Sequence, residues 1–376
     1  MRIGITCYPT YGGSGIVATE LGKELAERGH EIHFISYAPP LRLDKVSRNI
    51  QFHEVEVTTY PLFDHPPYTL ALATKMAEVA EIENLDLLHC HYAIPHSVSA
   101  FLAKSMLKPR HLPVVTTLHG TDITLVGSDR SYLPITKFSI EQSDGVTAVS
   151  NFLKEATLRT FGVKNDIEVI YNFVNCDIYK PIEGGELRGH YSPNGEKIVI
   201  HLSNFRPVKR PADVVEIFER VQAKIPAILL MVGDGPERSS AEWLVRHHGI
   251  DKKVHFLGKR DNIEDLIGIS DLLLLPSDNE SFGLVALEAM ACEVPVIVSK
   301  VGGLPEVVTD GVEGYLVEPR DVDKMAERAL HILSDESRRK EMGKGARETA
   351  RKRFCASKII PQYEQYYEKV VSRRSQ

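Results

Sequence analysis

The chain has 376 residues, more than one average domain, and this length predicts two domains. Hydrophobic residues make up 43% and charged residues 26%, which is typical of soluble globular proteins and excludes a disordered, collagen-like or coiled-coil chain. The net charge of −6 excludes a global basic field that would attract nucleic acid or anionic lipid. No apolar run reaches the roughly 18 residues of a membrane helix, and no signal-peptide pattern opens the chain.

The cysteines are odd in number, widely scattered and never spaced as Cys-x-x-Cys. This pattern argues against a disulfide framework or a zinc site and is typical of buried thiols in a reducing compartment. We therefore expect a cytoplasmic protein. The five residues are Cys7, Cys90, Cys176, Cys292 and Cys355.

Short apolar runs alternate with amphipathic segments from the N-terminus to residue 161. Strands are expected at 3–8, 32–37, 86–91, 113–118 and 145–149. Helices are expected at 16–28, 70–82, 97–107, 132–142 and 151–161. This alternation predicts a mostly parallel sheet with helices on both faces.

The alternation stops at 179–196, which is rich in Gly and Pro, and then restarts. Further strands are expected at 197–202, 228–232, 254–257, 272–275 and 294–298, and helices at 212–223, 237–247, 284–291 and 322–333. The stretch 338–371 is charged and helical, with no strand partner of its own.

The patterns together predict an α/β protein of two doubly wound, Rossmann-like domains that face each other across a cleft. The expected boundaries are 1–178 for the N-terminal domain, 179–196 for a linker, 197–353 for the second domain and 354–376 for a C-terminal helix that returns toward the first domain. Ligands of such sheets bind beyond the carboxyl ends of the strands, so the chemistry is expected on the loops that follow them.

A glycine loop, Gly12-Gly-Ser-Gly15, follows the first strand and opens a helix. Gly13, Ser14 and Gly15 would let phosphate approach free N–H groups, although a tight strand-to-helix turn explains the same residues. A nicotinamide cofactor needs a carboxylate after the second strand, and 36–40 contains none. A dehydrogenase is therefore disfavoured, while a phosphate site remains open.

Two further segments carry candidate ligand contacts. Arg206 and Lys209 lie on one loop after the first strand of the second domain and would bind a pyrophosphate, or else form a solvated loop. Glu280 and Glu288 flank an expected helix start with Ser281 as its N-cap, so that the N–H groups of Phe282, Gly283 and Leu284 face a ligand. Carboxylates accept hydrogen bonds from vicinal hydroxyls, so the two glutamates suit a sugar and a ribose.

The Gly12–Gly15 loop, the Arg206/Lys209 pair and Glu280-x7-Glu288, in this order along the chain, resemble the retaining GT-B glycosyltransferases of family 4, over essentially the whole chain. The resemblance implies that 1–178 is the acceptor domain and 197–353 the nucleotide-sugar domain. The resemblance implies that Glu280 contacts the donor sugar, Glu288 the ribose, and the basic pair the diphosphate.

It implies further that Arg260 lies where the uracil binds and that His119 lies near the transferred sugar. Family members of this type need no metal, so no cofactor is expected. His119, Glu280, Arg206 and Lys209 are the expected catalytic residues.

Three histidines, His89, His91 and His96, crowd one strand end. Their spacing is not that of a metal site, so we expect exposed histidines or histidines that act through a neighbour. On the acceptor side, Tyr92 and Thr121 match acceptor contacts of the family's inositol-phosphate enzyme. Arg130 is a candidate from its charge and loop position alone, and a polar loop residue is an equal alternative for all three.

The opening 7–15, His119-Gly-Thr-Asp122 and 203–209 resemble a branch of the family that transfers N-acetylglucosamine from UDP-GlcNAc to L-malate, in bacillithiol biosynthesis. The expected reaction is a front-side substitution with retention, in which departing phosphate takes the acceptor proton. Alternatives are another small or lipid acceptor, or a non-catalytic sugar-nucleotide binding protein. The acidic excess of 51–100 argues against a surface that binds lipid. We expect no nucleic acid or membrane partner. The sequence leaves a homo-oligomer open.

Overall fold

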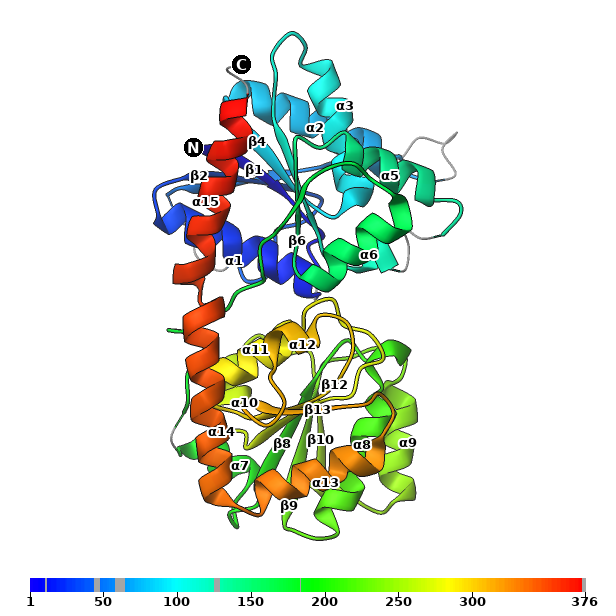
Figure 1. The fold of residues 1–376 in the computed structure, drawn as a ribbon, viewed down its shortest axis with the longest axis vertical. Helices are drawn as coiled ribbons and strands as arrows, with labels where there is room; N and C mark the ends of the chain where they lie inside the picture. Colours follow the sequence, from blue (N-terminus) through cyan, green and yellow to red (C-terminus); the bar gives the residue numbers. More distant parts are fainter. Residues whose placement is uncertain (11, 44–47, 58–64, 125–128, 183, 374–376) are drawn as a thin grey trace. The chain divides into compact units, whose positions relative to one another are not determined.

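The computed structural model describes residues 1–10, 12–43, 48–57, 65–124, 129–182 and 184–373. The chain divides into two compact units. Unit 1 comprises Met1–Asn172 and Ile359–Gln376, and unit 2 comprises Phe173–Lys358. Each unit contains one fully parallel sheet with helices on both faces (Figure 1). The prediction of two doubly wound α/β units is therefore confirmed.

The sheet of unit 1 has seven strands in the order β3-β2-β1-β4-β5-β6-β7. Its strands are β1 (Arg2–Thr6), β2 (Glu31–Ser36), β3 (Ile50–Glu54), β4 (Leu87–His91), β5 (Val114–Leu118), β6 (Gly145–Ala148) and β7 (Ile167–Val169). The four strands β1, β4, β5 and β6 are almost wholly buried, as the apolar runs in the sequence predict.

The helices of unit 1 pack in two layers. They are α1 (Gly13–Glu27), α2 (Tyr68–Ile82), α3 (Val98–Met106), α4 (Thr121–Thr124), α5 (Leu133–Glu141) and α6 (Asn151–Phe161), with a π-helical turn η1 (Ala93–Ser97). Helices α2 and α3 share a core with Ile35, Leu88 and Cys90 on one face. Helix α1 packs on the opposite face, where Phe34 contacts Gly22.

The C-terminal helix α15 (Ala356–Ser372) begins in unit 2 and belongs to unit 1 from Ile359 onward. Within unit 1 it packs on the face of β4 opposite to α2. The hydroxyl of Tyr367 hydrogen-bonds to Nδ1 of His89 at 2.7 Å, and that of Tyr366 donates to the carbonyl of Val146 at 3.1 Å. The last helix is thus part of the core of the first sheet.

The sheet of unit 2 has six strands in the order β10-β9-β8-β11-β12-β13. Its strands are β8 (Lys197–Leu202), β9 (Ala227–Val232), β10 (Val254–Gly258), β11 (Leu272–Leu275), β12 (Val296–Ser299) and β13 (Gly314–Val317). Helices α8 (Pro211–Gln222), α9 (Arg238–His247) and α13 (Val322–Leu333) share one core with the sheet. Helices α10 (Ile263–Gly268), α11 (Leu284–Ala291) and α14 (Glu336–Thr349) lie on the other face (Figure 1).

Short elements complete unit 2: α7 (Glu186–Tyr191), α12 (Leu304–Val307), the 3-10 turns η2 (Pro207–Lys209) and η3 (Asp251–Lys253), and the π-helical turn η4 (Ala350–Phe354). Helix α7 lies inside the 179–196 stretch that the sequence indicated as a linker, and that stretch falls within unit 2. The expected helix start at Phe282 is wrong, because α11 begins at Leu284 with Gly283 as its N-cap.

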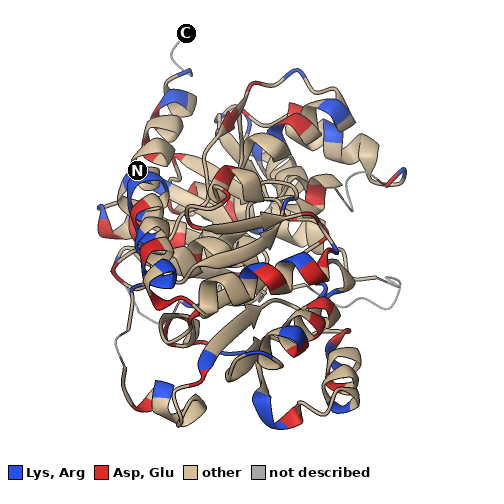
Figure 2. Cartoon of the chain, turned by 60° about the horizontal axis from the view of Figure 1, so that its bottom comes forward, with Lys and Arg blue, Asp and Glu red and all other residues tan. Residues whose placement is uncertain are grey.

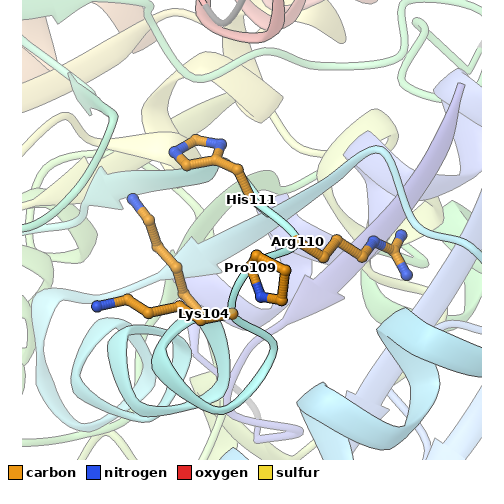
Figure 3. Close-up of a pocket in the computed structure, with 5 residues that line it drawn as sticks. Lys104, Pro109, Arg110 and His111 are labelled. Carbon is orange, nitrogen blue, oxygen red and sulfur yellow. The ribbon is translucent and has the colours of Figure 1, made fainter.

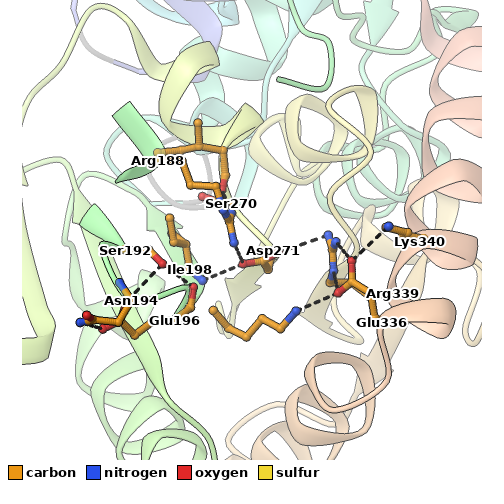
Figure 4. A network of polar contacts seen from close by, with 12 residues as sticks. Arg188, Ser192, Asn194, Glu196, Ile198, Ser270, Asp271, Glu336, Arg339 and Lys340 are labelled. Carbon is orange, nitrogen blue, oxygen red and sulfur yellow. Dashed lines mark hydrogen bonds and ion pairs between the residues drawn. The ribbon is translucent and has the colours of Figure 1, made fainter. Parts of the chain in front are cut away.

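At the amino edge of the unit 2 sheet, Asp271 fixes the start of the neighbouring strand β8. Asp271 accepts a hydrogen bond from the backbone N–H of Ile198 at 2.8 Å and donates its own N–H to the same residue's carbonyl at 2.7 Å. The Asp271 carboxylate, only 3% exposed, also contacts Arg188 at 2.8 Å and Arg339 at 3.3 Å (Figure 4). Buried charge of this kind is stable because each oxygen has several donors.

Charged groups of both signs alternate along the outer helices, and the strands carry few of them (Figure 2). This distribution agrees with the small net charge of −6. In the part of the chain that the structure describes, every helix is too short or too polar to span a bilayer.

Candidate active site

In unit 2, the loops after β8 and β11 join two residues that the sequence marked separately. Nζ of Lys209 lies 2.5 Å from Oε1 of Glu280, and Ser277 donates its hydroxyl to the same oxygen at 2.9 Å. The backbone N–H of Asp278 donates to the carbonyl of Val208 at 2.8 Å and ties the two loops together. A cation and a carboxylate therefore lie side by side at the carboxyl edge of the sheet, where ligands of such folds bind.

The Glu280 loop is held from behind by two glycines that follow β12. A Cβ on Gly302 would lie 1.8 Å from the carbonyl oxygen of Glu280, and one on Gly303 would lie 2.3 Å from that of Ser281. Gly303 also donates its N–H to the Glu280 carbonyl at 2.9 Å. The close approach fixes the backbone of the glutamate, and only glycine permits it.

A buried histidine in β8 and a glycine after β9 support the start of the loop that carries Lys209. His201 contacts the carbonyl of Leu274 through Nδ1 and the hydroxyl of Ser203 through Nε2, both at 2.9 Å. Burial and the nearby Lys209 lower the pKa of His201 to about 4, so the ring is neutral at pH 7. A Cβ on Gly233, which follows β9, would lie 1.8 Å from the Ser203 carbonyl oxygen.

The other expected donor residues in unit 2 are spread along the same edge. Arg206 is exposed at the start of η2, and Arg260 is exposed and donates to the Leu257 carbonyl at 3.0 Å. Glu288 is 3% exposed and accepts a hydrogen bond from the Tyr179 hydroxyl at 2.8 Å. A buried carboxylate needs a hydrogen-bond donor, and Tyr179 supplies one here.

The residues at the start of α11 differ in accessibility. Phe282 is buried and its ring packs edge-on against Phe354. Gly283 has φ of +93°, and a Cβ there would lie 2.4 Å from the side chain of Leu304. Leu284, the first helical residue, is partly exposed.

In unit 1, the glycine loop opens α1, as predicted. A Cβ on Gly15 would lie 2.5 Å from the carbonyl oxygen of Tyr8, so this position requires glycine. Gly13 is exposed with open space around its Cα, and Ser14 is partly buried. Packing therefore requires glycine at position 15, whereas the backbone of Gly13 is accessible. Tyr11, which precedes this loop within the motif 7–15, lies outside the described residues.

A chain of histidines runs along the adjacent strand ends. Nε2 of His119 lies 2.8 Å from Nδ1 of His91, and Nδ1 of His96 donates to the His91 carbonyl at 2.5 Å. Nε2 of His89 lies 2.6 Å from the hydroxyl of Thr117. Of the two alternatives expected for these histidines, exposure is wrong: His89, His91 and His96 are completely buried, because β4 is a central strand and η1 packs against β4 and β5.

Burial makes these rings weak bases. It lowers the pKa of His119 to about 3, that of His89 to about 3 and that of His96 to about 4. All of them are neutral at pH 7, since burial disfavours the charged imidazolium. His119 therefore offers a neutral hydrogen-bonding group, and proton uptake by this ring is unfavourable.

Asp122 holds the loop that carries His119. Its carboxylate accepts hydrogen bonds from the N–H groups of His119 at 3.2 Å, Gly120 at 2.9 Å and Ala93 at 3.1 Å. Burial outweighs these hydrogen bonds and raises the pKa of Asp122 to about 6. Asp122 belongs to the motif His119-Gly-Thr-Asp122, from which the sequence alone indicates no role for it.

The structure places one of the three expected acceptor residues beside His119. The ring of Tyr92 lies 5.3 Å from that of His119 and 5.6 Å from that of Tyr8, and its backbone has φ of +92°. A positive φ in a bulky residue is uncommon and is often found at binding sites. Thr121 is exposed at the start of α4, and Arg130 is exposed on the following loop.

A surface cavity of about 490 Å³ lies elsewhere in unit 1 (Figure 3). It is lined by Lys104 of α3 and by residues 108–111 of the loop before β5, at the amino edge of the sheet. Two of its cations are already engaged: Lys104 with Asp144 at 2.6 Å, and Arg110 with the carbonyls of Ala80 and Leu85. The cavity therefore lies at the edge of the unit 1 sheet opposite to the one that carries Tyr92 and His119.

Two units, each with a parallel sheet and with glycine loops and polar side chains at its carboxyl edge, are the architecture of the GT-B glycosyltransferases. Family models of "Glycosyltransferase Family 4" and "Glycosyl transferases group 1" match residues 11–178 and 186–349. The chain belongs to the family 4 glycosyltransferases.

Three similar proteins illustrate this membership. N-acetyl-alpha-D-glucosaminyl L-malate synthase of Bacillus anthracis is 53% identical over 98% of this chain and 96% of its own. D-inositol 3-phosphate glycosyltransferase of Mycolicibacterium smegmatis is 26% identical over 86% of this chain and 79% of its own. The crystal structure of Anabaena Alr3699/HepE with UDP and glucose is similar in fold, with a TM-score of 0.82 at 22% identity over 97% of this chain and 98% of that one.

Sequence reasoning missed several residues that build this site. Gly233 follows β9 directly, and Gly302 and Gly303 lie on the loop that follows β12, so a glycine just beyond the carboxyl end of a strand is a signal that could have marked them. Tyr179 and His91 act as partners of Glu288 and His119, and no local sequence signal indicates such long-range pairs.

Proposed function

We propose that this chain transfers N-acetylglucosamine from UDP-GlcNAc to the hydroxyl of L-malate, with retention at the anomeric carbon, as the first step of bacillithiol biosynthesis. The observation that carries this proposal is the 53% identity, along nearly the full length of both chains, to a protein named for that reaction. The chemistry of the two loop edges is consistent with it.

Unit 2 supplies the donor contacts in this proposal. Lys209 and Arg206 neutralise the charge that develops on the departing diphosphate, which is where fixed cations accelerate group transfer most. An ammonium has three N–H donors, so Lys209 can keep its contact with Glu280 while it binds a phosphate oxygen. Glu280 then accepts hydrogen bonds from the sugar hydroxyls, Glu288 from the ribose, and Arg260 lies against the uracil.

The start of α11 and the loop of unit 1 complete the proposed contacts to phosphate. The N–H groups of Gly283 and Leu284 open a helix on the same loop as Glu280, with Phe282 packed beneath them. In unit 1, the N–H groups of Gly13, Ser14 and Gly15 open α1 in the same manner.

Unit 1 also supplies the proposed acceptor contacts. Tyr92 and Thr121 lie on the loops after β4 and β5 and would hydrogen-bond to malate, and Arg130 would pair with one carboxylate. His119 stays neutral and contacts the transferred sugar, since burial lowers its pKa to about 3.

The bond changes follow from retention. The malate hydroxyl oxygen bonds to C1 of the sugar on the face from which UDP departs, and the C1–O bond to the phosphate breaks with its electron pair. The hydroxyl proton passes to the departing phosphate oxygen. His119 is too weak a base to accept this proton at pH 7, which favours the phosphate as acceptor.

The test is UDP release from UDP-GlcNAc with and without L-malate, followed by the NMR coupling constant of the anomeric proton in the product. Succinate, which lacks the hydroxyl, is the matched control. Malate-dependent release with an α-linked product supports the proposal. Donor binding with release that is equal for malate and succinate would refute malate as acceptor and direct a screen of other hydroxyl acceptors.

A further inference from the structure

Two histidines and a glutamate meet in unit 1, apart from the residues discussed above. His33 lies on β2, His53 on the edge strand β3, and Glu83 directly after α2. One ligand atom from each side chain lies within 4.8 Å of those of the other two. In the described part of the chain, no other group of three His, Cys, Asp or Glu side chains meets this criterion.

The register of the sheet brings the two imidazoles together. His53 pairs with Ile35, which is two residues beyond His33, so all three side chains point to the same face of the sheet. Ile35 packs there in the core beneath α2, and Glu83 caps the carboxyl end of that helix. The three side chains thus converge from a central strand, an edge strand and a helix end.

The geometry suits a shared ligand. Nδ1 of His33 lies 3.0 Å from Nε2 of His53, close to the separation of about 3.3 Å that two nitrogens have on one tetrahedral zinc ion with Zn–N bonds of about 2.05 Å. Nε2 of His33 is buried without a hydrogen-bond partner, so the ring's polar contact is the one that faces this site.

We propose that His33, His53 and Glu83 bind one divalent transition-metal ion of the zinc type, with solvent as the remaining ligand. Two imidazoles and one carboxylate suit Zn²⁺, Co²⁺ or Ni²⁺ better than Mg²⁺ or Ca²⁺, which prefer oxygen ligands. His53 and Glu83 are partly exposed beside the sheet edge, which gives the ion a route of entry. The ion ties β3 to α2 and is structural, since none of its ligands lies on the loops assigned to glycosyl transfer.

The test uses the full-length chain without an affinity tag, stripped with a chelator and titrated with Co²⁺. Binding is followed by the visible absorption of Co²⁺ in a site of low symmetry and is reversed by Zn²⁺. We expect one equivalent of tightly bound ion. Loss of one ligand should weaken Co²⁺ binding by at least about tenfold, since even changes outside the ligand set weaken metal sites by about 10- to 100-fold.

The variants are His53→Gln and Glu83→Gln, and His111→Gln, an exposed histidine at the surface cavity, is the matched control. Circular dichroism in chelator verifies that each variant folds, and Glu83→Gln changes only a partly exposed side chain. Zn²⁺ should raise the unfolding temperature of the wild type and of His111→Gln, and should not raise that of His53→Gln. The proposal would be overturned if the wild type did not bind Co²⁺ tightly. It would also be overturned if His53→Gln and Glu83→Gln both bound Co²⁺ as tightly as the wild type does.

Discussion

The buried histidine His89 should make the stability of unit 1 depend on pH in a way that one substitution can measure. Burial lowers its pKa from 6.5 to about 3, whereas the unfolded ring has a pKa near the usual value of about 6.5. Between these values the unfolded chain binds one more proton here than the folded chain, so the free energy of unfolding falls as the pH falls. This contribution is fully present above pH 6.5 and is lost progressively toward pH 3.

The size of the effect follows from the two pKa values. From pH 8 to pH 5 the loss is RT ln(1 + 10^1.5), or about 2 kcal/mol. The result barely depends on the folded pKa as long as that value stays well below 5, because the native ring then binds almost no proton. Asp122 acts in the opposite direction, since its pKa is raised to about 6 and its carboxyl binds a proton more readily in the folded chain.

Replacement of His89 by Gln isolates this one contribution. The Gln amide has both a donor and an acceptor, as the ring needs for the hydroxyls of Thr117 and Tyr367. The variant should be less stable at pH 8, yet it should lose about 2 kcal/mol less than the wild type between pH 8 and pH 5. Asp122 is present in both proteins, so its effect cancels in the comparison.

The assay is urea unfolding followed by far-ultraviolet circular dichroism at four pH values from 8 to 5. Hydrogen exchange of peptides from β4 and α15 then assigns the change to unit 1. If His89→Gln also keeps the full pH dependence, then His89 takes up its proton in the folded state and the reasoning from burial is refuted.

Three further substitutions test other parts of the structure. Lys209→Met should lower kcat at saturating donor by about 100- to 1,000-fold, as the loss of one charge-stabilising donor does. Lys300→Met, a change on an exposed loop, is the control and should leave kcat unchanged. An unchanged kcat in Lys209→Met would exclude Lys209 from the chemistry. Gly302→Ala should destabilise unit 2 in thermal unfolding, because its Cβ meets the Glu280 carbonyl at 1.8 Å; a wild-type melting curve would contradict this. Asp271→Ala should lower the free energy of unfolding by about 3–5 kcal/mol in urea titrations, and a loss under 1 kcal/mol would show that its ion pairs contribute little.

The central strands could be predicted from sequence, and of the four edge strands only β10 could. Buried parallel strands such as β8 and β11 are nearly continuous apolar runs, and their predicted bounds match the structure. The missed strands β3, β7 and β13 all lie at the edges of the two sheets. A short edge strand has one neighbour and needs no continuous apolar run, so it leaves a weak signal.

The candidate site was predictable at the level of loops, while its pairings were not. Ligands of parallel sheets bind beyond the carboxyl ends of the strands. Lys209 and Glu280 each lie on a loop that follows a strand, so the sequence marked each of them as a candidate, but separately. Their ion pair spans 71 positions in the chain and arises from the order of β8 and β11 in the sheet. The N-cap was predicted as Ser281 from residue preference, but the contact of Gly302 with Glu280 fixes the loop and moves the helix start to Leu284.

The two sheets are fixed at their amino edges by one recurring arrangement, and this explains why their carboxyl edges can carry the chemistry. Asp86, Asp144 and Asp271 each precede a strand, and each accepts the N–H of a residue at the start of the adjacent strand, at 2.7, 2.8 and 2.8 Å. Each also donates its own N–H to that residue's carbonyl, so register is set before the strand begins. Because the register is set at this edge, the glycine loops and the Lys209–Glu280 ion pair at the other edge are not needed for strand pairing. A change at any of these three aspartates should therefore alter stability first, and affect turnover only through loss of folded protein.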